Sequence, residues 1–157
     1  MRKRQISPIR PGITSPGQAW LDVDRTAVVE VTSEENGYPI ECALLGMEDQ
    51  GWRASDSGTQ TIRLIFDEPQ QLRRIWLVFE ESESTRTQQF VLRWSPDTGN
   101  SFREIVRQQW NFSLPGSVRE TEDYAVELSA VTVLELIIVP DMNGGTARAS
   151  LASLRLS

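Results

Sequence analysis

Four side chains in turn-forming stretches have the chemistry that a sugar-binding site uses: Tyr38, Arg53, Arg86 and Asn143. An aromatic ring stacks on the C–H face of a sugar, and a guanidinium or an amide binds its hydroxyl or carboxylate oxygens. Each residue also has a structural alternative. Tyr38 could cap a core, Arg86 could be a solvated surface arginine, and Asn143 could belong to a plain glycine-rich turn. Arg53 could pair with a nearby carboxylate, Asp56 or Glu48.

The residue types that most catalytic and metal sites need are absent or scarce. The chain has no histidine, which excludes His-dependent triads and the commonest zinc and iron ligand sets. Its one cysteine, Cys42, lies beside apolar residues and is expected to be a small buried hydrophobe. No pair of carboxylates falls in a glycosidase pattern, and no phosphate-binding glycine loop with a lysine is present. We therefore expect a protein that is not an enzyme and needs no cofactor.

The size and charge of the chain limit its partners. With 157 residues, 39% of them hydrophobic, it can form one well-buried core. Its net charge of -6 argues against binding to nucleic acid or to an anionic membrane, because phosphate surfaces attract positive fields. The first residues are basic, but no apolar core of a secretory signal follows them. We expect a cytoplasmic protein with a flexible arm over residues 1–19 and one domain over residues 20–157.

Strand patterns dominate the chain, and helix signals are weak. Residues 61–66, 72–79 and 89–95 alternate apolar and polar side chains, as half-buried strands do. Proline, aspartate, glycine and asparagine mark reversals at 67–71 and 95–101. We expect further strands over 26–33, 102–112 and 151–156, a loop over 113–123, and two short strands within 124–140. Short strands joined by turns are typical of an all-β antiparallel sandwich or jelly roll.

Three tryptophans have expected positions relative to this core. Trp52 follows a turn with two glycines and is expected to be a buried anchor. Trp76 alternates with Ile75 and Leu77, so it should point outward, where it could form a flank contact or an oligomer surface. Trp110, at the end of a strand, could be exposed or could pack on the core.

The order of these segments resembles the discoidin, or coagulation-factor C-type, domain of the galactose-binding-like fold. The stretch VEVTSEENGYPIECALLG follows the family's opening, with Ser33-Glu34 and Asn36-Gly37 in place. The stretch FVLRWSPDTGNSF matches a later serine, turn and aromatic, and VTVLELIIVP followed by LASLRL matches the end. The resemblance covers Thr26 to Leu156. It implies an eight-stranded antiparallel jelly roll that acts as a binding module.

The resemblance also implies a structural calcium in many members, held by a turn before the conserved tryptophan and by a late glutamate. Here Leu45 and Met47 replace the two aspartates of that turn, and Ser153 stands where the glutamate is expected. Calcium needs several hard oxygen ligands, which an alkyl group and a thioether cannot supply. We expect no metal, although Glu48 and Asp49 leave a shifted site open.

Members of this family bind sugars, lipid head groups or proteins, and the fold alone does not choose among them. The family places its ligand loops at one end of the barrel, which would bring Tyr38, Arg53, Arg86 and Asn143 together. We expect a carbohydrate-binding module for a neutral or acidic sugar. The alternative is a protein-interaction module of a larger intracellular assembly.

Overall fold

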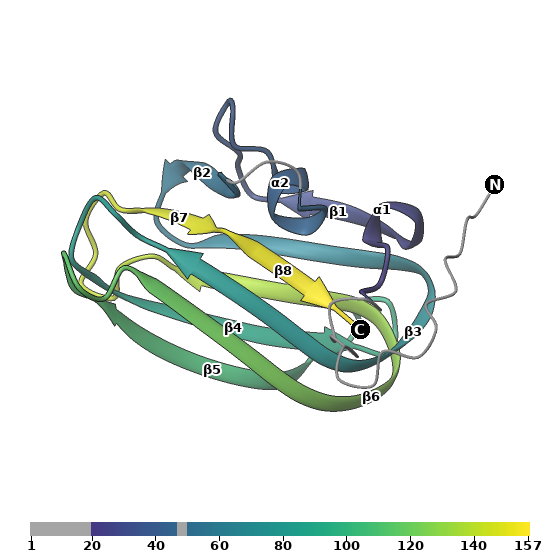
Figure 1. The fold of residues 1–157 in the computed structure, drawn as a ribbon. Coiled ribbons are helices and arrows are strands. Elements are labelled where there is room, and N and C mark those ends of the chain that lie inside the picture. The colour runs from purple at the N-terminus through teal and green to yellow at the C-terminus, as the bar shows by residue number, and fades with distance from the viewer. Residues whose placement is uncertain (1–19, 47–49) are drawn as a thin grey trace, which may run out of the picture.

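The computed structural model describes residues 20–46 and 50–157 (Figure 1). The arm expected over residues 1–19 and the three residues 47–49 lie outside this part of the chain. In order, the elements are α1 (Val23–Thr26), β1 (Ala27–Val31), α2 (Ile40–Leu44), β2 (Trp52–Ser57), β3 (Gln60–Glu80), β4 (Arg86–Ser95), β5 (Arg103–Phe112), β6 (Arg119–Val139), β7 (Arg148–Leu151) and β8 (Ser153–Leu156). No helix in the described part is long and apolar enough to cross a membrane.

The strands form a two-layer antiparallel sandwich in which β3 and β6 take part in both layers. The first half of β3 pairs with β1 and with the second half of β6, which in turn pairs with β4, and β4 pairs with β5. The second half of β3 pairs with the first half of β6 and with β8. The short β2–β7 pair lies beside this second layer, where Ser150 of β7 donates to the carbonyl of Glu80. Both long strands bend at the right-hand end of Figure 1.

The bends explain two differences from the sequence expectation. The reversal predicted at 67–71 is a bend within β3, where the register with β6 shifts between Ile65 and Arg74. The loop predicted over 113–123 is shorter, because β6 already begins at Arg119, which pairs in register with Glu80. The two strands predicted within 124–140 are the halves of one strand, and no pairing is formed at Ser129 and Ala130.

The core lies between the layers, where the alternating side chains meet. Phe79 from one layer and Phe90 from the other contact each other with ring centroids 5.0 Å apart, and both are fully buried. Cys42 is buried as predicted. Trp76 points away from the core and stacks on Trp20 with ring centroids 6.1 Å apart.

Candidate functional site

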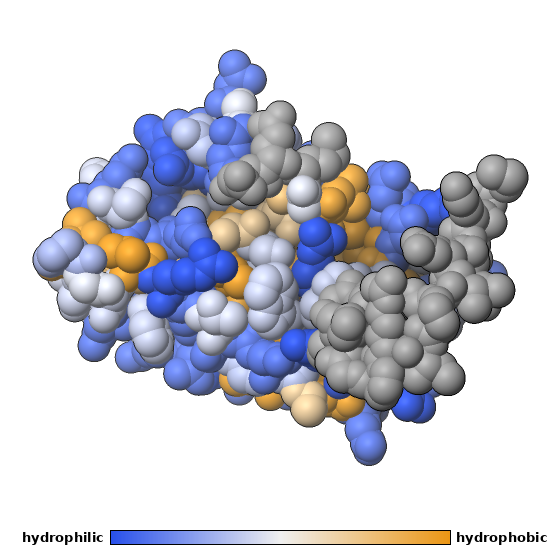
Figure 2. Space-filling view, in the orientation of Figure 1, coloured by the Kyte–Doolittle hydropathy of each residue, from blue (hydrophilic) through white to orange (hydrophobic). Residues whose placement is uncertain are grey.

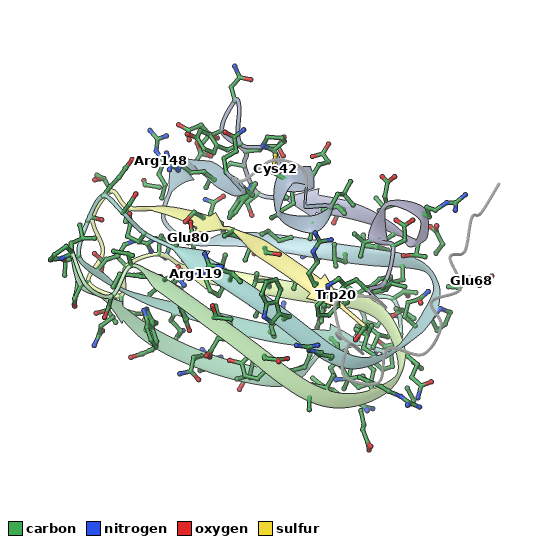
Figure 3. All side chains as sticks on the ribbon, in the orientation of Figure 1. Trp20, Cys42, Glu68, Glu80, Arg119 and Arg148 are labelled. Atoms are coloured by element: carbon green, nitrogen blue, oxygen red, sulfur yellow. The ribbon has the colours of Figure 1, made fainter. Side chains whose placement is uncertain are left out.

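A cleft of about 930 Å³ lies at the end of the sandwich opposite the bends of β3 and β6. It is lined by Glu35, by Trp52 and Arg53 of β2, by the β3–β4 connection at 80–85, by Val118 and Arg119, and by parts of 141–152. Glu80, Arg119 and Arg148 lie at this left-hand end in Figure 3, whereas Trp20 and Glu68 lie toward the other end. Connections that are far apart in sequence therefore form one site, in the size range of small-ligand pockets.

The base of the cleft is formed by Trp52, which is 1% exposed and whose indole nitrogen has a hydrogen-bond partner. Its Nε1 donates a hydrogen bond to the carbonyl of Ser33, 3.1 Å away, which ties β2 to the 32–39 loop. Gly51, directly before it, has φ 67°, and a Cβ there would lie 2.5 Å from the carbonyl oxygen of Leu151. The predicted anchor role of Trp52 is confirmed.

Arg53 lies on β2 rather than on the expected loop, and it joins two rims of the cleft. Its Nη1 is 3.6 Å from Glu35 Oε2 and 3.9 Å from Glu83 Oε1. Its guanidinium also lies over the ring of Tyr38, 4.6 Å from the centroid. Among the described carboxylates its partners are therefore Glu35 and Glu83 rather than the expected Asp56, and Glu48 lies outside the described residues. The aromatic face expected for a sugar is covered by this guanidinium.

Arg86 lies behind the wall of the cleft, with its side chain 1% exposed. The guanidinium donates to Glu81, to the side chain of Gln88 and to the carbonyl of Pro140, and it lies over the ring of Phe112. Burial alone would raise the pKa of Glu81, but hydrogen bonds from the Glu83 backbone and from Arg86 outweigh it, so the pKa lies below its usual range. Arg86 thus fastens the 81–85 connection to the start of the 140–147 loop.

Asn143 is exposed in the 140–147 loop, at the same end of the sandwich as Arg86. Its backbone N–H donates to Asp141 Oδ1 at 3.0 Å, and the neighbouring Met142 N–H donates to the carbonyl of Thr87 at 2.8 Å. Asp141, Gly144 and Gly145 line the cleft beside it. The structure therefore brings Tyr38, Arg53 and the Asn143 loop to one end, with Arg86 beneath them.

Two further ion pairs at the rim were missed by the sequence reasoning. Arg148 Nη1 lies 2.9 Å from Glu35 Oε1, although the two residues are 113 positions apart. Arg119 pairs with Glu80 across the β3–β6 register. No local motif connects such residues, so only the strand pairing, once known, could have identified them.

The guanidinium of Arg155 lies at the start of the turn that precedes Trp52. Arg155 of β8 donates from Nη1 to the carbonyl of Leu44 at 3.1 Å, and its guanidinium lies against Gly46. Ser153, on the same strand, offers no carboxylate. Within the described ranges no cluster of three metal-binding side chains is found. Met47, Glu48 and Asp49, on which the expectation partly rests, lie outside the described residues.

Glu120 is the most perturbed carboxyl near this end, but it does not line the cleft. It is 1% exposed and both of its oxygens lack a hydrogen-bond partner in the described part of the chain. Burial, together with the charge of Glu122, raises its pKa to about 7. It pairs in register with the core residue Phe79, so it faces the interior and could not reach a ligand in the cleft. The half-buried Trp110 packs against the core.

Comparisons with known proteins agree on the fold. No protein-family model and no curated protein matches the chain. A solved carbohydrate-binding module of Clostridium perfringens, in complex with GalNAc-beta-1,3-galactose, has a TM-score of 0.63 at 19% identity, covering 88% of this chain and 99% of that one. The CBM32 of AlyQ, in complex with 4,5-unsaturated mannuronic acid, also has a TM-score of 0.63, at 15% identity, covering 88% and 98%.

A third solved structure, reduced XRCC1 bound to the DNA pol beta catalytic domain, has a TM-score of 0.59 at 11% identity. It covers 85% of this chain and 95% of that one. These identities are too low to transfer a function, but the architecture extends over nearly the whole described domain. The predicted all-β antiparallel jelly roll is confirmed, and the chain has the galactose-binding-like fold.

Proposed function

We propose that the protein is a non-catalytic carbohydrate-binding module whose ligand occupies the cleft at the Arg53 end. The observation that carries this proposal is the cleft itself, which gathers separate connections of a fold whose solved neighbours include modules in complex with sugars. Its rim offers guanidinium, carboxylate, hydroxyl and backbone groups, which can form hydrogen bonds with sugar hydroxyls.

The ion pairs of the rim favour a neutral sugar over an acidic one. The arginines that line the cleft, Arg53, Arg119 and Arg148, each have a glutamate partner already. An acidic sugar would have to displace these carboxylates, whereas hydroxyl groups can bond to paired guanidinium and carboxylate groups without separating them. Arg53 lines the cleft and remains the proposed ligand contact. Tyr38, whose ring lies under the Arg53 guanidinium, and Asn143, next to Gly144, are not among the lining residues and would contact only a ligand that extends past the rim. The sequence suggested that Arg86 contacts the ligand. We propose instead that Arg86 stabilises the wall of the cleft.

A glycan array probed with the full chain tests this proposal. Thr146→Trp places a large ring in an exposed position that lines the cleft, and Thr121→Trp places the same ring on an exposed part of β6 that does not. We expect neutral glycans to bind the parent and Thr121→Trp but not Thr146→Trp. If no glycan binds the parent, or if Thr146→Trp binds equally well, the carbohydrate proposal fails.

Protein interaction is the second candidate function. A solved neighbour with the same fold is bound to another protein, and this chain has an apolar hollow outside the cleft. In this alternative the domain would act within a larger intracellular assembly, and the cleft would remain empty on the array.

A further inference from the structure

A hollow of about 350 Å³ lies beside β1, and we call it the β1 groove. Its walls are apolar side chains of β1 and of α2, including Val29, Val31, Ile40 and Leu44. Figure 2 shows hydrophobic residues between α1 and α2, over β1. None of the residues that line the β1 groove also lines the cleft, so the two hollows are separate sites within the described part of the chain.

The strand beside this groove is an edge of its sheet. β1 is the terminal strand in the order β1-β3-β6-β4-β5, and β3 is its one strand partner in the described residues. An edge strand presents unpaired backbone N–H and C=O groups to any chain that lies alongside it. Val28, on the opposite face of β1, is 57% exposed, so apolar surface is open on both faces of this edge.

The rim of the β1 groove carries charge of one sign. Asp24, Glu34 and Glu41 line it, and no arginine or lysine of the described residues does. Glu34 accepts a hydrogen bond from the Ile40 N–H, 2.7 Å from its Oε1, which begins α2. Neither Asp24 nor Glu41 forms an ion pair within the described residues, so two exposed carboxylates stand beside an apolar hollow without a counter-charge.

We propose that the β1 groove and the free edge of β1 bind an extended peptide whose groove-facing side chains, every second residue, are apolar over β1 and lysine or arginine where they reach the acidic rim. Such a peptide would add a strand to β1 through main-chain hydrogen bonds. Alternate side chains of the added strand would point the same way as Val29 and Val31, into the groove. Its basic residues would lie near Asp24 and Glu41 and steer the encounter. This proposal does not depend on the carbohydrate function of the cleft.

Selection from a phage-displayed library of random peptides, each about twelve residues long to span the edge strand, tests the inference on the full chain. Asp24→Lys and Glu41→Lys reverse the two unpaired charges, and Glu127→Lys makes the same change at an exposed position of β6 outside the groove. We expect enriched peptides to be basic and apolar. Their affinity should fall about tenfold or more for the two groove variants and change less than about twofold for Glu127→Lys.

A second readout separates strand addition from simple charge attraction. Bound peptide should slow amide hydrogen exchange within Ala27–Val31, because an added strand protects edge amides. No enrichment, equal binding to the reversed variants, or unchanged exchange at β1 would overturn the inference. It is also overturned if peptides bind only after Arg2, Lys3, Arg4 and Arg10 are replaced by Ala, because the chain's own basic segment would then be the occupant.

Discussion

The two ends of the sandwich hold their loops in different ways. At the bend end, the 95–102 turn closes on itself: Asp97 accepts hydrogen bonds from the hydroxyls of Ser95 and Ser101, both at 2.6 Å. These bonds hold the pKa of Asp97 down to about 2. At the cleft end, the rim is joined by pairs such as Arg148–Glu35 and Arg53–Glu83, whose members come from different connections.

The difference follows from what each region does. The 95–102 turn only reverses the chain, whereas the rim of the cleft has polar groups that a ligand can reach. The bonds to Asp97 join residues within four positions of one another, so they form with the turn itself, and Thr132 of β6 adds two bonds from outside the turn. The rim's pairs are partly exposed and each is worth little, while buried Trp52 and Arg86 hold the base. A ligand can therefore bind to the rim groups without loosening the base.

The largest expected effect comes from the base of the cleft. Trp52→Ala removes a buried ring and the hydrogen bond to the Ser33 carbonyl, and should lower the free energy of unfolding by about 3–5 kcal/mol. Urea denaturation measures this. A variant with the same free energy of unfolding as the parent would mean that Trp52 does not anchor the base.

Arg86→Met should cost about 3 kcal/mol, because it leaves the half-buried Glu81 without its counter-charge and the buried Pro140 carbonyl without its donor. The matched rim change, Arg53→Gln, should cost no more than about 1 kcal/mol, because its ion pairs are long and partly exposed. Thermal unfolding of both variants tests the division between base and rim. Equal losses would contradict it.

Glu120 should make the stability of the protein fall as the pH rises. Its folded pKa of about 7 lies above the ordinary value of 4.5, so its contribution is fully present below about pH 4.5 and is lost as pH rises through 7. The loss should be about 3 kcal/mol. Glu120→Gln cannot ionise, so the difference in free energy of unfolding between variant and parent should change between about pH 4.5 and 7. A parallel pair of stability curves would disprove the assignment.

Asp97 should show the opposite sign in a more acidic window. Its folded pKa lies below the ordinary value of 3.8, so its stabilising contribution is present above about pH 4 and is lost as pH falls toward 2. Asp97→Asn should therefore melt at a lower temperature than the parent at pH 7, and the difference should disappear near pH 2. Ligand binding in the cleft should not change, since the turn lies at the other end.

The smallest expected effect is that of calcium, which should not shift the melting temperature. Arg155 already donates to the Leu44 carbonyl, an oxygen of the kind that calcium takes, and Leu45 and Ser153 supply no carboxylate. An ion bound at a hundredfold excess over its Kd would add roughly 2.7 kcal/mol. Melting curves in millimolar calcium and in chelator should coincide, and a shift of several degrees would show that an ion does bind.

The sequence predicted what depends on local pattern and missed what depends on pairing between strands. Alternation placed Ile75, Leu77 and Phe79 in the core and turned Trp76 outward, as the structure shows. The partners of Arg53 could not be predicted, because Glu35 and Glu83 reach it only through the packing of separate loops. The burial of Arg86 could not be predicted either, because it depends on Phe112 and Pro140, which lie on other segments.

The passage of β3 and β6 through both layers has a consequence for how the domain unfolds. Each strand contributes one half to each sheet, so neither layer can separate while the two strands remain paired along their length. Partial opening would have to break the same two strands that hold the rest of the core. We therefore expect one cooperative transition, with the slowest-exchanging amides of β3 and β6 protected to the same global free energy in both sheets.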